Sequence, residues 1–408
     1  MLSRCCASVP VLPLNAVATS WQATAEASLL SWCRSRGACS KALDVSVLSS
    51  VRGLRATRSV APGTHLFSVP LELCISSESG PAEWTPEARL AARLLEEDAA
   101  PGSPFRPWLD VLPRDVSHFG AFFDFDERTR SYAPLMRLRS RLAALNAVAE
   151  PTVLEHLRRS GVRASPALFA WAVALVRTRA FEATPGTDVF VPFLDLANHS
   201  PRDACLAWDW DPASQSMVVS SCGAGLVAGT EAFNSYGERD NDSCFLYGGF
   251  VVQNNEDDTV EVFDTLAAAS EWWVTSRVGA MLAGNDGPGA VGAEEARTVA
   301  RALEAAAAQH AARSGEAACA GLALGHGFDV DGRLVDLFEA LASREVGPRL
   351  APEAATAAVC MRAKELLDSW PAQQPQRCEI AEEDVVARRN DLCDQLMAAK
   401  RSLLATFL

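Results

Sequence analysis

Three short segments of the chain carry polar side chains and glycines in places where an ordinary core would not hold them. They are 52–56 (RGLRA), 178–201, with TRAF at its start and VPFLDLANHSP at its end, and 231–250, which begins with EAFNSYG and ends with GGF. In each segment a group that can bind or react stands next to apolar residues. We therefore take these three segments as the candidates for chemistry.

Arg179 ends an apolar helical stretch, LFAWAVALV at 168–176. A guanidinium is costly to bury there unless an anion accompanies it. The anion is either the carboxylate of a bound ligand or an acid of the chain itself, such as Asp195 or Glu182. The residues alone leave both alternatives open.

Gly53 and the pair Asn198-His199 also suit a binding site. A glycine lets the backbone approach a ligand that a β-carbon would hold off, and a buried amide needs hydrogen-bond partners that a ligand can supply. Both features have ordinary explanations as well. Gly53 fits a β-turn without any ligand, and Asn, His, Ser and Pro are common turn residues.

Tyr236 is the strongest candidate for a reacting group. The chain has only three tyrosines, at positions 132, 236 and 247, and this one stands inside the tripeptide SYG. A rare residue type in such a setting indicates a role for its hydroxyl. The alternative is a tyrosine at the end of a strand, with its hydroxyl in solvent.

In their order and spacing, the three segments resemble those of the SET-domain methyltransferases, and more narrowly those of the Rubisco large-subunit lysine methyltransferase family. The specific part is NHSP followed by SYG, with TRAF before them and a Gly-Phe pair after them; the motifs cover about 53–252. The resemblance implies an α+β fold. A SET domain of short β-sheets over 28–255, with a knot-like crossing and a helical insertion at about 85–175, would precede an all-α substrate-binding domain over 264–408.

The resemblance also implies roles for individual residues. The cofactor would be S-adenosyl-L-methionine, and its expected contacts are Arg52, Gly53, Leu54, Arg179, Asn198, His199 and Tyr236. The expected contacts of the substrate are Asp195, Phe181, Phe193, Phe233 and Phe250, with the phenylalanines as walls of a lysine channel. Asp195 is equally explained as a structural residue. Tyr236 is the expected catalytic residue, and no metal site is expected.

The reaction implied is methyl transfer to a lysine side chain of a non-histone protein. Transfer from a sulfonium is an in-line displacement, so the protein must supply alignment and a neutral amine. A free lysine has a pKa of about 10.4, and its neutral form costs about 3 kcal/mol at pH ~8. A narrow apolar channel lowers that pKa by desolvation, and a tyrosine hydroxyl orients the lone pair.

One position departs from the family pattern. The family often has a second tyrosine directly before the final Gly-Phe, whereas here that position is Gly248 and the tyrosine is Tyr247. The pocket would then be wider, which leaves the number of methyl groups and the target residue open, since a histidine-directed relative exists in this broad group. Phe181 favours lysine, because an imidazole would need a hydrogen-bond partner there.

The same residues fit two other interpretations. A degenerate SET fold could capture peptides without catalysis, and it would not need to bind S-adenosylmethionine. A Rossmann-type nucleotide site is suggested by Gly223 and Gly225 after the strand pattern MVVS. A dinucleotide fingerprint should open a helix directly after its glycines. Here another strand pattern follows, so a glycine-rich hairpin is expected instead.

The elements that position these segments follow from periodicity and from turn signals. Short strands are expected within 45–70, at 189–193 and at 216–220. Helices are expected at 28–36, 86–100, 136–148, 152–161 and 165–181, the last with Ser165 as N-cap and Pro166 at its first position. From Asp264 onward the pattern is nearly all helical, with a loop at 284–289 and an apolar stripe along 392–407.

Composition limits the classes of function. The chain of 408 residues has a net charge of -14 and no Lys/Arg-rich run, so no nucleic-acid partner is expected. An acidic body favours basic partner surfaces, such as a protein with an exposed lysine. Twelve scattered cysteines, without a C-x-x-C pair, read as buried thiols of a reducing compartment. No membrane partner is expected, and we expect a monomer.

The first 27 residues have no acid before Glu26, which fits either a disordered start or an organellar transit segment. The compartment, cytoplasmic or plastid, therefore stays open.

Overall fold

The computed structural model describes residues 20–48, 51–125, 127–276, 278, 291–314, 321–370 and 385–408. Its contacts divide the chain into two compact units. The first comprises Met1–Phe123, Arg141–Gly237 and Arg377–Arg389, and the second comprises Asp124–Ser140, Glu238–Gln376 and Asn390–Leu408. The expected domain limits, 28–255 and 264–408, do not coincide with this division and stay a prediction.

The first unit contains three small antiparallel or mixed sheets. The hairpin pairs β1 (Leu43–Leu48) with β2 (Val51–Ala56). A four-stranded sheet has the order β3 (His65–Pro70), β8 (Ser216–Ser221), β7 (Ala204–Asp211) and β9 (Phe233–Asn234), and β9 runs parallel to β7. A three-stranded sheet has the order β4 (Ile75–Ser76), β6 (Thr187–Phe190) and β5 (Ala180–Thr184).

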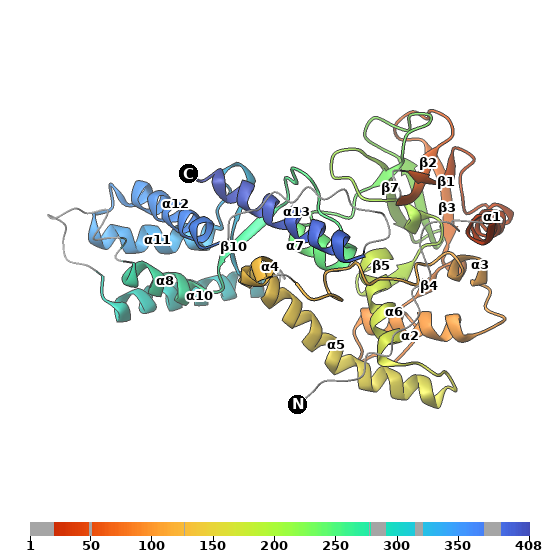
Figure 1. Ribbon diagram of the computed structural model, residues 1–408, viewed down its shortest axis with the longest axis horizontal. Coiled ribbons are helices and arrows are strands. Elements are labelled where there is room, and N and C mark those ends of the chain that lie inside the picture. Colours follow the sequence, from red (N-terminus) through yellow and green to blue (C-terminus); the bar gives the residue numbers. More distant parts are fainter. Residues whose placement is uncertain are drawn as a thin grey trace. The chain divides into compact units, whose positions relative to one another are not determined.

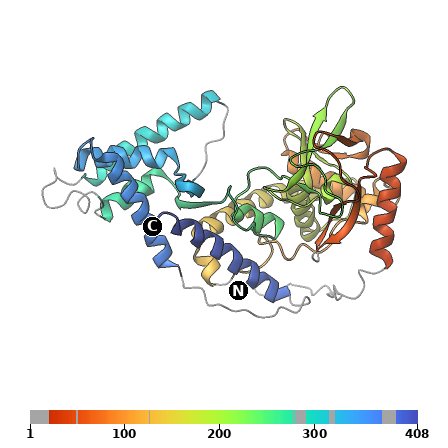
Figure 2. The same ribbon diagram turned by 90° about the horizontal axis from the view of Figure 1, so that it is seen from above.

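Helices pack around these sheets. They are α1 (Ser20–Ser35), α2 (Pro86–Ala99), α3 (Arg106–Leu109) and α6 (Pro166–Arg179). Both views show α1 beside the β1–β2 hairpin (Figures 1 and 2). Their apolar faces form one core that includes Leu54, Phe67, Leu94, Leu175 and Phe190, all 2% exposed or less. The expected cap of α6 is confirmed, because Ser165 accepts a hydrogen bond from the Leu168 amide at 3.2 Å.

The second unit is mostly helical. Its helices are α4 (Glu127–Ser131), α7 (Asn241–Ser243), α8 (Leu266–Thr275), α10 (Ala293–Ser314), α11 (Gly332–Glu345) and α12 (Ala351–Ser369), and a π-helix, η3, spans Cys244–Gly248. Two further helices, α5 (Ala133–Arg159) and α13 (Val385–Ala405), contribute residues to both units. Figure 1 shows α11 with α12 and α8 with α10 as neighbouring pairs.

Several expectations about these elements need correction. The strand β11 (Leu322–Gly325) interrupts the region from Asp264 onward that we expected to be nearly all helix, and it pairs antiparallel with β10 (Thr259–Phe263), which precedes that region. The helices expected at 136–148 and 152–161 are one helix, α5, which continues through Pro151. Proline removes a single backbone donor, and a long helix tolerates this as a local kink. The first helix begins at Ser20 instead of residue 28.

Other expectations are confirmed or lie outside the described residues. The apolar stripe expected along 392–407 is buried, with Leu396 and Leu403 of α13 and Phe407 just after it at most 1% exposed. Gly223 and Gly225 adopt positive φ angles, 56° and 79°, in a turn that opens no helix, so the dinucleotide interpretation fails. The stretch 1–19 and the expected loop at 284–289 lie outside the described residues. In the described part of the chain no helix is long and apolar enough to cross a membrane.

Candidate functional site

Two of the three segments found in the sequence lie side by side in the first unit. The Asn234 amide donates to the carbonyl of Asn198 at 2.9 Å, and the Ser200 amide donates to the carbonyl of Asn234 at 3.1 Å. His199 and Asn234 form a parallel β-bridge. The end of the NHSP segment is therefore a backbone partner of the SYG segment, as the candidate site requires.

Tyr236 is held at three points against the NHSP segment. Its amide donates to Nδ1 of His199 at 3.0 Å, and its hydroxyl donates to the carbonyl of Ala197 at 2.9 Å. The two rings stack, with 5.0 Å between centroids and 22° between planes. Because the hydroxyl hydrogen points to Ala197, the lone pairs of the phenolic oxygen remain able to accept a hydrogen bond from elsewhere.

Gly53 lies where a side chain would collide with this assembly. A β-carbon placed on Gly53 would stand 2.5 Å from Oε1 of Glu231 and 2.7 Å from Nδ2 of Asn198. These distances are far below normal contact, so only glycine fits without a shift of its neighbours. The close approach explains Gly53 better than a turn does, since β2 is extended there.

Glu231 is a residue of the site to which we assigned no role from the sequence. Its Oε1 accepts a hydrogen bond from Nδ2 of Asn198 at 2.7 Å, and the same Nδ2 donates to the carbonyl of Arg52 at 3.1 Å. Glu231 is brought there by backbone pairing with β2, because the Ala232 amide donates to the carbonyl of Leu54 at 2.8 Å. Both donors of the Asn198 amide are thereby used, so the side chain could serve a ligand only through its acceptor, Oδ1.

Arg179 finds its anion within the chain. Its Nη1 lies 2.7 Å from the carbonyl of Asp195 and 3.5 Å from Oδ2 of the same residue. The indole of Trp108 donates to that Oδ2 at 3.1 Å, and the Asp195 side chain is 0% exposed. Burial raises the pKa of the Asp195 carboxyl, and Arg179 opposes that effect. The ion-pair alternative for Arg179 is the one that the structure contains.

This burial corrects our expectation for Asp195. A carboxylate with no exposed surface, held by Trp108 and Arg179, cannot reach the backbone of a substrate peptide. Its place in the fold makes it a counter-ion that positions Arg179. Of the two roles that the sequence left open for Asp195, substrate contact and structural residue, the structure favours the second.

A second guanidinium lies close to this pair. Burial lowers the pKa of Arg52, and the positive charge of Arg179 lowers it further. Glu26 on α1 lies 3.9 Å from Arg52. Among the described residues, Nε of Arg179 and Oδ1 of Asp195 are buried without a hydrogen-bond partner. The guanidiniums of Arg52 and Arg179, with Nε of Arg179 not yet hydrogen-bonded, suit the carboxylate of a small ligand.

The phenylalanines that we expected to line a lysine channel differ in how deeply they are buried. Phe181 on β5 packs edge-on against Trp208, with 5.2 Å between centroids, and Phe233 on β9 is half-buried. Phe193 is 0% exposed and packs against Phe67 at 5.4 Å, so it cannot line an open channel as expected. Its φ of 75° places it in a tight turn that leads into the short helix carrying Asp195.

The remaining candidates are explained by packing. Leu54 is fully buried in the core, and its carbonyl accepts a hydrogen bond from the Ala232 amide, so the part of Leu54 in cofactor binding stays a prediction. Phe250 belongs to the second unit, where its ring fills the space that a side chain at Gly248 would need. A tyrosine at position 248 is therefore incompatible with this position of Phe250. The part of Phe250 in substrate binding stays a prediction.

Comparison with known proteins finds similarity to protein methyltransferases. No model of a known protein family matches the chain. The actin-histidine N-methyltransferase of Drosophila melanogaster is 26% identical over 276 residues, which cover 57% of this chain and 50% of that protein. The human actin-histidine N-methyltransferase is 23% identical over 262 residues, 57% of this chain and 43% of that protein. The ribosomal lysine N-methyltransferase set10 of Schizosaccharomyces pombe is 26% identical over 99 residues, 23% of this chain and 18% of that protein.

Solved structures match over a much larger share of the chain. The SET domain of LSMT bound to lysine and AdoHcy superimposes with a TM-score of 0.65 at 14% identity, covering 94% of this chain and 91% of that one. Rubisco LSMT bound to AdoMet gives a TM-score of 0.63 at 15% identity, covering 94% and 90%. The expected resemblance to SET-domain methyltransferases of the Rubisco type is thus confirmed, and so is the expected fold. The chain spans about half the length, or less, of these curated relatives.

Proposed function

We propose that this protein, which has the fold of the LSMT SET domain, transfers a methyl group from S-adenosylmethionine to the side-chain nitrogen of a lysine in another protein. One observation carries the proposal. The segment that ends in Asn198-His199 is hydrogen-bonded to the segment that carries Tyr236, so that a polar binding edge and a phenol lie together. The names of the curated relatives, which are protein methyltransferases, support the reaction class.

The residues of the first unit fit the polar ends of the cofactor. Arg52 and Arg179 are the pair that would hold its carboxylate, with Asp195 fixing Arg179 in place. Oδ1 of Asn198 is the acceptor that would take its ammonium, because the amide donors are already used by Arg52 and Glu231. Gly53 would act indirectly, because the absence of a β-carbon lets the side chains of Glu231 and Asn198 lie close against β2. When bound, the cofactor supplies a methyl group on a sulfonium, which a neutral amine can displace.

Tyr236 would orient the target amine. Its hydroxyl hydrogen is engaged by the carbonyl of Ala197, so its oxygen can accept an N–H of the amine and direct the lone pair of the nitrogen. The amine must first lose its proton, which costs about 3 kcal/mol at pH ~8 in water. Apolar surroundings lower this cost by penalising the ammonium form. Phe181 and Phe233 are the residues on the first unit that supply such surroundings.

Lysine is the target that the site favours, although the relatives differ. Two relatives are named for a histidine of actin and one for a ribosomal lysine. An imidazole must be held by a hydrogen bond for one nitrogen to attack, since its ring has two. Phe181 offers no such bond, because a phenyl ring carries no hydrogen-bonding donor or acceptor group. Histidine-directed transfer is the second candidate function, and it is supported by the actin-histidine relatives.

Calorimetric titration with S-adenosylmethionine tests the proposal together with a transfer assay on a protein extract. The proposed function requires saturable binding of the cofactor and incorporation of its labelled methyl group into protein. Binding of protein partners without any binding of the cofactor would identify the chain as an adaptor and contradict the proposal. Thermal stabilisation by the cofactor is a supporting readout, because a ligand that binds only the folded state raises its stability.

A further inference from the structure

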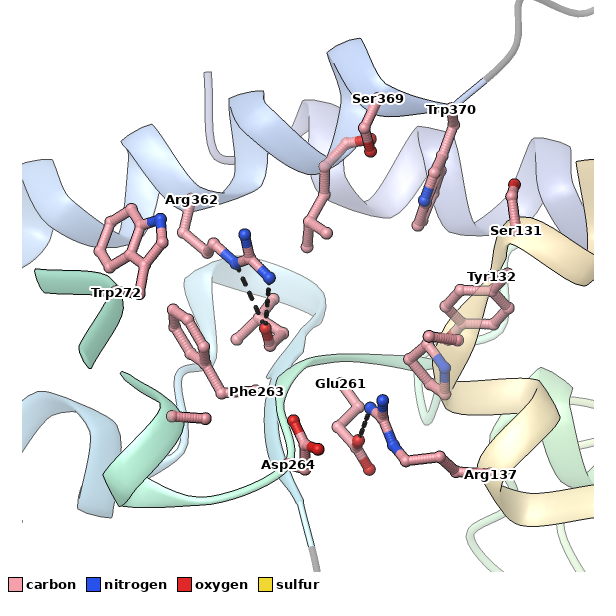
Figure 3. Close-up of a pocket in the computed structure, with 15 residues that line it drawn as sticks. Ser131, Tyr132, Arg137, Glu261, Phe263, Asp264, Trp272, Arg362, Ser369 and Trp370 are labelled. Atoms are coloured by element: carbon pink, nitrogen blue, oxygen red, sulfur yellow. Dashed lines mark hydrogen bonds and ion pairs between the residues drawn. The ribbon is translucent and has the colours of Figure 1, made fainter. Parts of the chain in front are cut away.

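A cavity of about 280 Å³ lies within the second unit. It is bordered by the turn that begins α5, the end of β10, the start of α8 and the last turns of α12. Figure 3 shows Phe263 and Trp272 on one side of it and Tyr132 and Trp370 on the other. Nothing in the proposed methyl transfer uses these residues.

The aromatic wall of the cavity already carries a guanidinium of the chain. The centre of the Arg362 guanidinium lies 4.6 Å from the ring centroid of Phe263 and 5.9 Å from that of Trp272. Its Nη2 donates to the carbonyl of Val262 at 3.1 Å. Figure 3 marks hydrogen bonds of Arg362 with dashed lines. Arginine planes stack on aromatic faces through the ring quadrupole. The cavity is thus built from surfaces that accept arginine.

Among the charged side chains around the cavity, the carboxylate of Asp264 has no ion-pair partner among the described residues. Arg137 is paired with Glu261, and Arg362 lies 3.3 Å from Glu365. Asp264 lines the same cavity beside Glu261 (Figure 3) and makes no hydrogen bond or ion pair with any described residue. Two arginines and two carboxylates line the cavity, so the lining carries no net charge, but Asp264 is the one of the four without a partner among the described residues. An unpaired carboxylate beside aromatic faces can hold an organic cation.

The size of the cavity and the charge of the chain define the ligand further. A volume of about 280 Å³ is at the lower limit for small-molecule sites, so the cavity suits one side chain better than a nucleoside cofactor. The chain has a net charge of -14, which attracts basic protein surfaces. We propose that this cavity binds an arginine side chain of the protein substrate, at a place separate from the methylated residue. The identity of the partner rests on the proposed function, whereas the ligand chemistry does not.

The experiment uses the full chain and two synthetic peptides that differ only in one side chain. One peptide carries an arginine between alanines and the other carries citrulline, which has the same shape without the charge; each has a photoreactive benzophenone beside this residue. We expect calorimetry to show that the arginine peptide binds about fivefold more tightly than the citrulline peptide. This factor corresponds to the free energy of one partly exposed charge pair. Its crosslinks should map to 261–272 or 362–370. Equal affinities of the two peptides, or crosslinks elsewhere, would overturn the proposal.

Two matched variants make the assignment to Asp264 specific. Asp264→Asn should reduce the affinity of the arginine peptide about fivefold and leave that of the citrulline peptide unchanged. Asp336→Asn removes an exposed carboxylate of α11 and should change neither affinity. A loss of affinity equal in both variants would show a general charge effect and contradict the site. These measurements need no methyl transfer, so their failure leaves the proposed function standing, and failure of cofactor binding leaves the peptide result standing.

Discussion

The ring of Tyr236 lies on the imidazole of His199, and the backbone amide of Tyr236 donates to Nδ1 of that imidazole at 3.0 Å. The two residues are 37 positions apart in the chain. Because Nδ1 acts as the acceptor, His199 fixes both the backbone and the ring plane of Tyr236. The phenol then has one place for its hydroxyl, against the carbonyl of Ala197. The site thus presents a rigid oxygen acceptor.

Tyr236→Phe removes that oxygen and keeps the ring on His199. We expect methyl transfer to fall by about 100-fold or more, the range for loss of a group that orients and accepts in proton-coupled chemistry. The affinity for S-adenosylmethionine should stay within about twofold, because the hydroxyl is bonded to Ala197 and serves the amine. Single-turnover rates and calorimetry measure the two quantities separately. An unchanged rate would remove Tyr236 from the mechanism.

Arg179 should have two separable roles, as counter-ion of Asp195 and as a contact of the cofactor. Arg179→Met leaves the buried Asp195 carboxylate without its cation, and we expect a loss of about 3 kcal/mol in the free energy of unfolding. The double variant Arg179→Met with Asp195→Asn removes that charge as well, so most of the stability should return. Its affinity for S-adenosylmethionine should stay low. Urea unfolding and calorimetry on both variants give the comparison.

Full recovery of cofactor affinity in this double variant would show that Arg179 serves only the fold. The single variant Asp195→Asn is the matched control. It keeps the guanidinium and the bond from Trp108 to a side-chain oxygen, so its affinity for the cofactor should exceed that of either Arg179 variant.

Gly53→Ala tests the close packing beneath the candidate ligand. The new β-carbon would displace Glu231 and Asn198, which would stand 2.5 Å and 2.7 Å from it. We expect a loss of about 1–3 kcal/mol in stability and a drop of at least about tenfold in cofactor affinity. Gly102→Ala is the control in the same unit, since nothing lies within 4 Å of its β-carbon position. Equal behaviour of the two variants in thermal unfolding and calorimetry would contradict this account of Gly53.

The second unit contains a buried ionic cluster that predicts a pH effect. Nζ of Lys400 lies 2.6 Å from Oδ1 of Asp258 and 3.3 Å from Oδ2 of Asp242, and the Tyr132 hydroxyl donates to the same Oδ2 at 2.8 Å. Burial raises the pKa of Asp242 to about 7, against the lowering effect of Lys400, and Asp240 and Asp258 raise it further. Lys400 itself has a raised pKa because of these acids, so it stays charged.

The sign of the effect follows from the proton balance. Unfolded Asp242 titrates near pH 4, so between about pH 4 and about 7 the folded chain holds a proton that the unfolded chain releases. The contribution of Asp242 to the free energy of unfolding therefore falls as the pH rises through this window. Asp242→Asn should remove that decline, by up to about 3 kcal/mol, when the free energies of unfolding in urea at pH 5 and pH 8 are compared. A variant with the same pH dependence as the natural chain would contradict the raised pKa.

Much of the fold could be predicted because its signals are local. The Ser165 cap, the apolar stripe of α13 and the glycine turn at 223–225 each depend on neighbours in the sequence. The strand β11 was missed because its short apolar run, LALG, sits between helical patterns, and only its pairing with β10 makes it a strand. The motifs NHSP and SYG were recognised as a pair, and the structure brings them together.

The burial of individual site residues could not be predicted. Asp195 and Phe193 stand in the same motif as Asn198, and their types gave no sign that one lies beneath Trp108 and the other against Phe67. Glu231 was visible in the third segment, but its partner is fixed by the pairing of residues 230–232 with β2. Such contacts join residues far apart in sequence, where periodicity carries no information.

The most direct test of the central claim is mass spectrometry of proteins methylated by this chain. The natural protein and the Tyr236→Phe variant are incubated with labelled S-adenosylmethionine and a protein extract, and the modified residue is identified. The account predicts methyl-lysine that depends on the natural protein and is nearly absent with the variant. Label on histidine would contradict the choice of lysine, and equal label from both proteins would contradict the site itself.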